Sequence, residues 1–235
     1  MHAVTTAELL GVWERGLAQR PIERALEILR AAGVGASIEE IAAYSVGERD
    51  RLLLTLREWL FGADIGAVAF CPRCREKLEL NFSARDLLTG GPSPEDVAVS
   101  GDGFELRLRP ITSADLLAAD SRETLLRRAV VAAHRSGDPV SVDALPAELI
   151  EAAVSRLAAS DPHADIQIAV ECPGCGHSHS APFDVVSFLW SEIEAWAVRM
   201  LREVHTLASA YGWREADILA LSPTRREFYL ELASA

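Results

Sequence analysis

The sequence predicts an α+β fold, mostly helical, with small antiparallel β-hairpins forming a zinc-ribbon-like four-cysteine site. Two observations predict it. Most of the chain repeats apolar residues at the spacing of amphipathic helices, whereas short segments around two Cys-Pro-x-Cys motifs have the character of strands. Those two motifs contain all four cysteines of the chain. With 49% hydrophobic and 25% charged residues, a chain of 235 residues has the composition of an ordinary globular protein.

Residues 1–62 predict a helical N-terminal part. Thr5-Thr6-Ala7-Glu8 has the form of a capping box, and Pro21 stands where a helix often has its first residue. A further helix follows Ser45 and stops at Gly62. We expect the apolar stripes of these helices to bury against one another; an exposed groove for a partner is the alternative.

The two cysteine pairs, Cys71-Pro72-Arg73-Cys74 and Cys172-Pro173-Gly174-Cys175, predict a metal centre. Two C-x-x-C pairs in one chain are the usual form of a four-cysteine zinc site. Strand-like residues lead into and out of each pair, so we expect hairpins over residues 65–82 and 165–183 with one pair at each tip. The pairs are therefore expected to supply two thiolates each to one zinc ion per chain.

The two hairpins also look like copies of one unit. Phe82 and Phe183 each lie eight residues after the second cysteine of their pair. Ser83 and Asp184 follow, and both are good N-caps for a helix. This gapless alignment predicts a duplicated unit of strand, turn, strand and helix start.

Four protein ligands leave zinc no open position, so the predicted ion is structural. Alternatives remain at this point: a redox motif, a long-range disulfide, or a ligand set that includes His177 or His179. A strand after each pair disfavours the redox motif, and a disulfide needs an oxidising compartment. Gly176 suits a left-handed turn after the second pair, but the corresponding residue of the first pair is Arg75, which predicts a backbone cost there.

Between the hairpins, residues 89–164 predict a mostly helical insertion. A Gly/Pro-rich break at 90–94 precedes a predicted hairpin over 97–100 and 104–109. The segment 113–160 is expected to be helical, and one apolar stripe in it comprises Leu125, Leu126, Ala129, Val130 and Ala133. Because one zinc would join both hairpins, we expect a single domain over residues 1–235.

Residues 184–235 predict a long C-terminal helix followed by short ones. Apolar residues recur every three or four positions from Asp184 to Tyr211, and Gly212 ends the helix. Trp, Tyr and Arg dominate the energetics of protein interfaces, so this region predicts a partner-binding surface. The predicted contact residues are Trp213, Ile218, Leu221, Arg225, Arg226 and Tyr229. The alternative is that these aromatic residues pack the last helices against the long helix.

Charge and motifs exclude several classes of function. A net charge of −12 disfavours nucleic-acid binding through a general electrostatic footprint. No segment approaches the roughly 20 apolar residues that span a bilayer, and the N-terminus has no secretory signal, so we expect a cytoplasmic protein without a membrane partner. The common nucleotide-binding and hydrolase motifs are absent, so composition and motifs by themselves indicate only a soluble zinc protein, with no small-molecule substrate expected.

Several runs together resemble one known family. They are Phe188-Leu189-Trp190-Ser191-Glu192-Ile193, Glu203-Val204-His205, Tyr211-Gly212-Trp213, the stretches 217–223 and 225–230, Gly47-Glu48-Arg49-Asp50 with the leucines that follow, Asp161-Pro162-His163-Ala164-Asp165-Ile166 and both cysteine pairs. In these runs the chain resembles T4-type phage baseplate proteins, or baseplate hub assembly chaperones, of tailed phages, prophages and bacterial contractile injection systems. Arg75 departs from the family pattern, in which a glycine follows each pair.

The resemblance implies a non-enzymatic assembly factor (chaperone) or component of the baseplate or central hub of a contractile phage-tail-like injection machine. The partners implied are baseplate or hub and spike proteins, and the protein would be cytoplasmic or incorporated in a phage-tail-like particle. The residues alone keep two alternatives open. One is a zinc-ribbon nucleic-acid-binding regulator, motivated by the C-terminal helix–turn–helix-like run and Arg225-Arg226; the other is a zinc hydrolase that uses His177 or His179.

Overall fold

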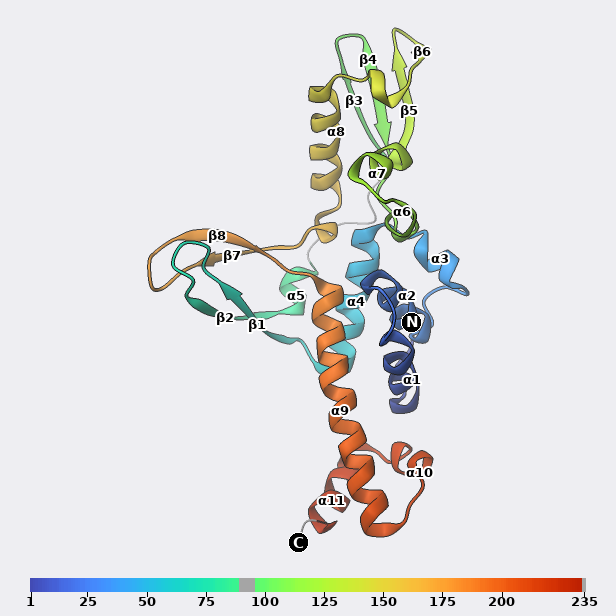
Figure 1. The fold of residues 1–235 in the computed structure, drawn as a ribbon, viewed down its shortest axis with the longest axis vertical. Helices are drawn as coiled ribbons and strands as arrows, with labels where there is room; N and C mark the ends of the chain where they lie inside the picture. The colour runs from blue at the N-terminus through green and yellow to red at the C-terminus, as the bar shows by residue number, and fades with distance from the viewer. Residues whose placement is uncertain (89–95, 234–235) are drawn as a thin grey trace. The chain divides into compact units, whose positions relative to one another are not determined.

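The computed structural model describes residues 1–88 and 96–233 (Figure 1). The chain divides into two compact units, and the expectation that one zinc ion joins both hairpins into a single domain stays a prediction. The terminal unit comprises Met1–Val34 and Val186–Ala235, and the central unit comprises Gly35–Val185. The predicted helical N-terminal part is therefore split, because its first two helices pack with the C-terminal helices and the next two belong with the hairpins.

The terminal unit is entirely helical in the residues described. Its helices are α1 (Thr6–Gly16), α2 (Pro21–Ala31), α9 (Val185–Tyr211), α10 (Glu215–Leu219) and α11 (Pro223–Ala233). The capping box predicted for the first helix forms, since Thr5 Oγ1 accepts the Glu8 N–H at 3.3 Å and the Glu8 carboxylate accepts the Thr5 N–H at 2.9 Å. The long helix is confirmed as α9, and most of its predicted stripe is buried. Leu189, Ile193, Met200, Val204 and Leu207 are each at most 8% exposed, whereas Tyr211 at the end of the stripe is 37% exposed.

A close contact joins α1, α2 and α9 within this unit. The Arg24 guanidinium lies 4.4 Å above the centre of the Trp190 ring, and its Nε donates to the Gly16 carbonyl oxygen at 2.8 Å. Gly16 leaves room for the indole, because a Cβ at this position would overlap the ring. The absence of a side chain at residue 16 therefore sets how closely the helices approach.

We expect Gly16→Ala to lower the free energy of unfolding by about 2 kcal/mol, because the added methyl group forces the packed Trp190 ring to move. Gly11→Ala is the matched control in the same helix, where the new Cβ meets only the end of the Arg15 side chain. That control should be neutral or slightly stabilising, since alanine favours helix. Urea unfolding of both variants measures the difference, and equal losses would contradict the packing argument.

The central unit contains three antiparallel sheets among its described residues. Its elements are α3 (Ile38–Ala42), α4 (Val46–Phe61), β1 (Asp64–Phe70), β2 (Lys77–Ser83), α5 (Ala84–Leu87), β3 (Val97–Gly101), β4 (Phe104–Leu108), α6 (Ser113–Ala118), α7 (Arg122–Ala129), β5 (Val130–Arg135), β6 (Asp138–Pro139), α8 (Ala147–Ser160), β7 (Gln167–Glu171) and β8 (Ser178–Pro182), with 3₁₀ turns at Val142–Ala144 and Pro162–Ala164. Strands β1–β2 and β7–β8 form two hairpins, and the third sheet has the order β3-β4-β5-β6.

The prediction of continuous helix over residues 113–160 is wrong between Val130 and Pro139, where the chain forms β5 and β6. Two β-branched residues, Val130 and Val131, favour extended backbone directly after α7. Strand β5 then pairs with β4, with Leu106 opposite Ala133. Ser136 and Gly137 both have positive φ, 53° and 94°, and so make the tight turn to β6. The insertion is thus a mixed sheet-and-helix layer, and the predicted Gly/Pro break at 90–94 lies outside the described residues.

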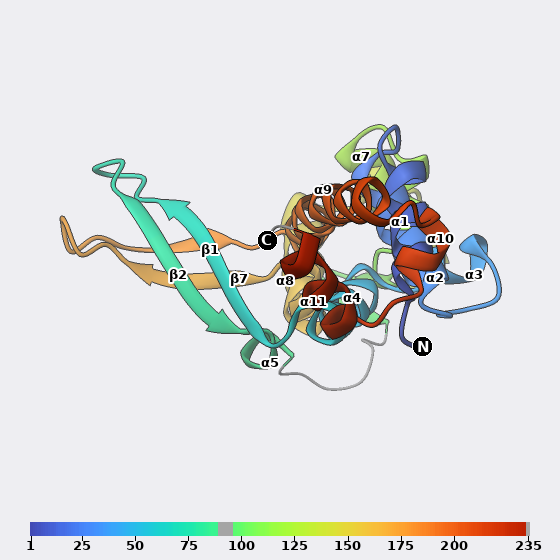
Figure 2. The same ribbon diagram turned by 90° about the horizontal axis from the view of Figure 1, so that it is seen from below.

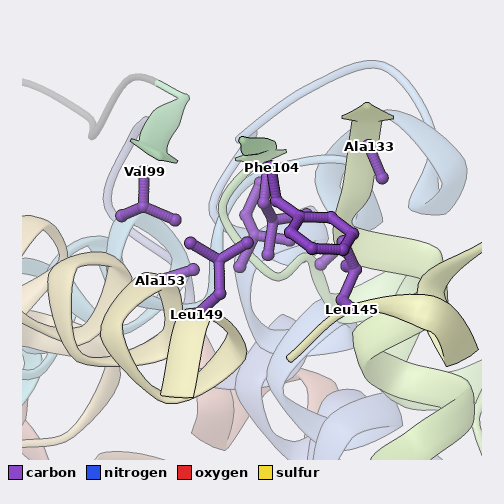
Figure 3. Close-up of a cluster of buried hydrophobic side chains, with 9 residues drawn as sticks. Val99, Phe104, Ala133, Leu145, Leu149 and Ala153 are labelled. Atoms are coloured by element: carbon purple, nitrogen blue, oxygen red, sulfur yellow. The ribbon is translucent and has the colours of Figure 1, made fainter. Parts of the chain in front are cut away.

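Helix α8 covers one face of this four-stranded sheet (Figure 3). Strand β4 alternates buried and exposed residues, as predicted, with Phe104, Leu106 and Leu108 facing the helix. These side chains pack against Leu149 and Ala153 of α8. This apolar layer is the separate core of the insertion, the segment that lies between the two hairpins in the sequence.

Candidate metal centre

Each hairpin presents two cysteines in the turn that joins its strands, as the sequence predicted. Figures 1 and 2 show the hairpins β1–β2 and β7–β8 side by side, with both turns at the same end. In the first turn, the Cys71 N–H donates to the Glu76 carbonyl and the Arg75 N–H donates to the Cys71 carbonyl, both at 2.9 Å. The second turn repeats these bonds from Cys172 to His177 and from Gly176 to Cys172, at 3.0 and 2.8 Å. The two turns therefore have one backbone pattern.

The four sulfur atoms lie together. Sγ of Cys71 is 3.7 Å from Sγ of Cys175, Sγ of Cys74 is 3.6 Å from Sγ of Cys172, and all four lie within 4.8 Å of one another. Four Zn–S bonds of about 2.3 Å in a tetrahedron would place the sulfurs about 3.8 Å apart. The group therefore has the dimensions of a tetrathiolate metal site, and thiolates are the ligands that zinc and iron prefer.

Backbone amides prepare one of these thiols for ionisation. The N–H groups of Cys74 and Arg73 donate to the Cys71 sulfur and lower the pKa of this thiol to about 6. The Glu76 N–H lowers the pKa of Cys74, but desolvation and the neighbouring thiols outweigh it and raise that pKa to about 12. One thiolate therefore forms readily, whereas four adjacent negative charges require a bound cation.

The surroundings of the sulfurs are apolar and repeat between the hairpins. Cys71 and Cys172 are fully buried beside Leu78 of β2 and Val170 of β7. The two phenylalanines that the sequence places at corresponding positions, Phe82 and Phe183, make an edge-to-face contact with ring centres 5.4 Å apart. Contact between corresponding residues is what an approximate two-fold relation between copies of one unit produces.

The two histidines lie outside the sulfur group. His177 and His179 stack on each other with ring centres 5.7 Å apart. Within residues 1–88 and 96–233, the one group of at least three metal-binding side chains consists of the four cysteines. Four thiolates fill a tetrahedral shell, so the geometry favours a closed site over the hydrolase alternative.

The turn after each pair is left-handed, with φ of 66° at Arg75 and 65° at Gly176. A residue other than glycine destabilises the folded protein by about 1 kcal/mol when it adopts this conformation, and glycine does not. We therefore expect Arg75→Gly to raise the free energy of unfolding of the metal-loaded protein by about 1 kcal/mol, and Gly176→Ala to lower it by a similar amount. Chemical unfolding of the two variants tests the pair, and the same sign for both would contradict the shared turn geometry.

Comparison with protein families identifies the chain. The model of the family described as T4 bacteriophage base plate protein matches residues 19–190. The chain belongs to this family. The matched region contains both cysteine pairs of this base plate family member, and it ends before the predicted C-terminal contact residues. Comparisons with curated proteins and with solved structures found no match. No helix in the described part of the chain is long and apolar enough to cross a membrane.

Two motifs that support the family resemblance meet in the central unit. Asp161 Oδ2 accepts the Gly47 N–H at the first turn of α4, at 3.1 Å. Next to it, Arg49 Nε donates to Asp50 Oδ1 at 2.7 Å, and Arg49 Nη1 donates to Ser113 Oγ at 3.3 Å. Burial raises the pKa of Asp50, although Arg49 opposes this shift. A buried polar cluster thus fastens the start of α4 to residues far away in the sequence.

The predicted partner-binding residues all lie after α9, in α10, in α11 and in the segments that join these helices. Ile218 is fully buried and, with the partly buried Trp213 and Tyr229, packs against Leu207 of α9. Arg226 is 6% exposed and its Nε donates to Glu203 Oε2 at 2.7 Å.

Leu221 is half-buried and Arg225 is exposed. Packing within the terminal unit explains why Trp213, Ile218, Arg226 and Tyr229 are buried or partly buried. The partner-binding role of the six residues stays a prediction. Phe228 and Leu232, which were not among the predicted contact residues, are 58% and 54% exposed. Their spacing from Arg225, three and seven residues, was the available signal that they share one helix face.

Proposed function

We propose that this base plate family member is a non-enzymatic assembly factor, a chaperone, for the baseplate or central hub of a contractile phage-tail-like injection machine. The observation that carries the proposal is the family match over residues 19–190. A baseplate family implies protein partners, and the partners proposed are baseplate, hub or spike proteins. The protein would act in the cytoplasm of the producing cell, or remain in the particle as a component.

The proposal includes one structural Zn²⁺ per chain, held by Cys71, Cys74, Cys172 and Cys175. The sulfur separations support it, and a closed shell of four thiolates leaves no position for a substrate. Cys74 and Cys172 are 98 positions apart in the sequence, so an ion that joins them closes a long loop and contributes its binding free energy to folding. The role of the ion is to keep the two hairpins together.

The proposed contact surface is the exposed face of α11, formed by Arg225, Phe228 and Leu232. Aromatic and arginine side chains contribute most to protein interfaces, and a hydrophobic residue that is more than half exposed gains by being covered. Two predicted residues lie next to this face: the Tyr229 ring centre is 6.4 Å from that of Phe228, and Trp213 makes an edge-to-face contact with Tyr229. The surface fits a partner with an apolar groove and a carboxylate to pair with Arg225.

Affinity purification of the tagged full chain from a producing cell, followed by mass spectrometry, tests the function. Hub, spike or baseplate proteins in the eluate, with no copy in finished particles, would support a chaperone. A fixed number of copies in the particle would support a permanent component instead. Recovery of nucleic acid or polymerase without tail proteins would overturn the proposal.

A variant experiment tests the contact surface. We expect Phe228→Ala with Leu232→Ala to reduce the recovery of tail proteins at least about tenfold, because interface aromatics are often hot spots. Leu17→Ala is the matched control, since Leu17 is 51% exposed in the same unit. Equal recovery with the double variant and the control would remove this face from the proposal.

A further inference from the structure

The outer face of α9, opposite its buried stripe, carries uncovered apolar side chains. Val198 is 38% exposed and Leu201 is 37% exposed. They lie on an open, nearly flat surface of this helix, together with Arg202, His205 and Thr206. An exposed helix face with apolar side chains at its centre is a surface against which a second helix can pack.

Charged residues of opposite sign flank this apolar patch. At 3.6 residues per turn, Glu194, Ala195, Leu201 and Arg202 all lie within about 60° of Val198 around the helix axis. Glu194 and Arg202 are exposed, four residues before and four after Val198. Neither side chain has an ion-pair or hydrogen-bond partner among the residues described. They lie about 12 Å apart along the axis, too far to pair with each other.

We propose that this face binds the same face of a second copy of the chain, with the two α9 helices antiparallel and a two-fold axis at Val198. At 1.5 Å per residue, Glu194 and Arg202 lie about 6 Å on either side of that axis. Reversal of the second helix brings each Glu194 level with the Arg202 of the other copy. The arrangement therefore forms two equivalent ion pairs around a contact between the two Val198 side chains, which is the self-complementarity of an isologous interface.

The charges also select this arrangement over a parallel one. A parallel pair in the same register would bring Glu194 next to Glu194 and Arg202 next to Arg202, and like charges across an interface are strongly unfavourable. Ala195 is small enough to allow close approach, and the Leu201 side chain of the other copy packs beside it. This inference is independent of the proposed function, since it rests on the terminal unit alone.

Sedimentation of the full chain over a wide concentration range tests the proposal. We expect a reversible dimer. Glu194→Arg and Arg202→Glu should each raise the dimer dissociation constant about a hundredfold, because each places like charges at both symmetric contacts. The double exchange, Glu194→Arg with Arg202→Glu, should restore dimerisation. Arg199→Glu is the matched control: it changes the net charge equally but lies about 100° around the helix from Val198.

A monomer at every concentration would overturn the proposal, and so would a double exchange that dissociates as the single variants do. If the wild type is monomeric but Arg202→Glu loses a tail protein in affinity purification, the face belongs to a different partner and self-association is refuted. The helical content of each variant, measured by circular dichroism, should equal that of the wild type because the exchanged residues are exposed.

Discussion

Cys172→Ser is expected to remove the metal and lower the free energy of unfolding of the protein by at least about 3 kcal/mol. Structural zinc sites stabilise small domains directly, because ion binding is coupled to folding. The fully buried Cys172 also lies in the apolar contact between the hairpins, so its loss affects both the ion and the packing. The measurements are the zinc content of the purified protein and its melting temperature with and without a chelator.

His177→Ser is the matched control for the metal centre. It changes a side chain two residues after Cys175 that lies outside the sulfur group, so the variant should keep one zinc per chain. Four sulfur ligands in the X-ray absorption spectrum of the wild type would confirm the ligand set. A metal-free wild-type protein that is folded, or a chelator without effect on the melting temperature, would refute the structural role of zinc.

Gly47→Ala is expected to cost about 3 kcal/mol, more than any other glycine substitution proposed for this protein. A Cβ on residue 47 would occupy the space of the Asp161 carboxylate, which accepts the backbone N–H of that same residue. The substitution therefore combines overpacking with the loss of a buried hydrogen bond to a charged group. The free energy of unfolding from urea titration measures the loss.

A double-mutant cycle separates the clash from a general effect on the helix. If the carboxylate is the obstacle, Asp161→Ala combined with Gly47→Ala should cost clearly less than the sum of the single variants. Gly66→Ala in β1 is the control, because its Cβ would meet Asn81 at an ordinary 3.7 Å. Additive losses in the cycle would show that the close approach of Asp161 does not explain the need for glycine.

The four-cysteine cluster could be predicted from the sequence because the residues that form each turn are close together in the chain. Each turn is closed by hydrogen bonds between residues at most five positions apart, and the two cysteine pairs repeat the same spacing. The first residues of α1 and α2 and the last residue of α9 were equally predictable. A capping box marks the start of α1, Pro21 marks the start of α2, and Gly212 follows the end of α9. These features depend on residues that are close together in the chain, so the sequence alone is sufficient to predict them.

The sequence thus determined the group of four cysteines, the two hairpins and the long helix by itself. Only the tertiary structure decided what depends on distant residues. The apolar spacing around Ala129 and Val130 fits either a helix or a strand, and pairing with β4 makes it a strand. Gly47 is restricted by Asp161, 114 positions away. The sequence predicted Arg226 as a partner contact, and only the structure shows that it pairs with Glu203 of α9 within the terminal unit. Long-range contacts of this kind are set by how elements pack, which periodicity and spacing do not encode.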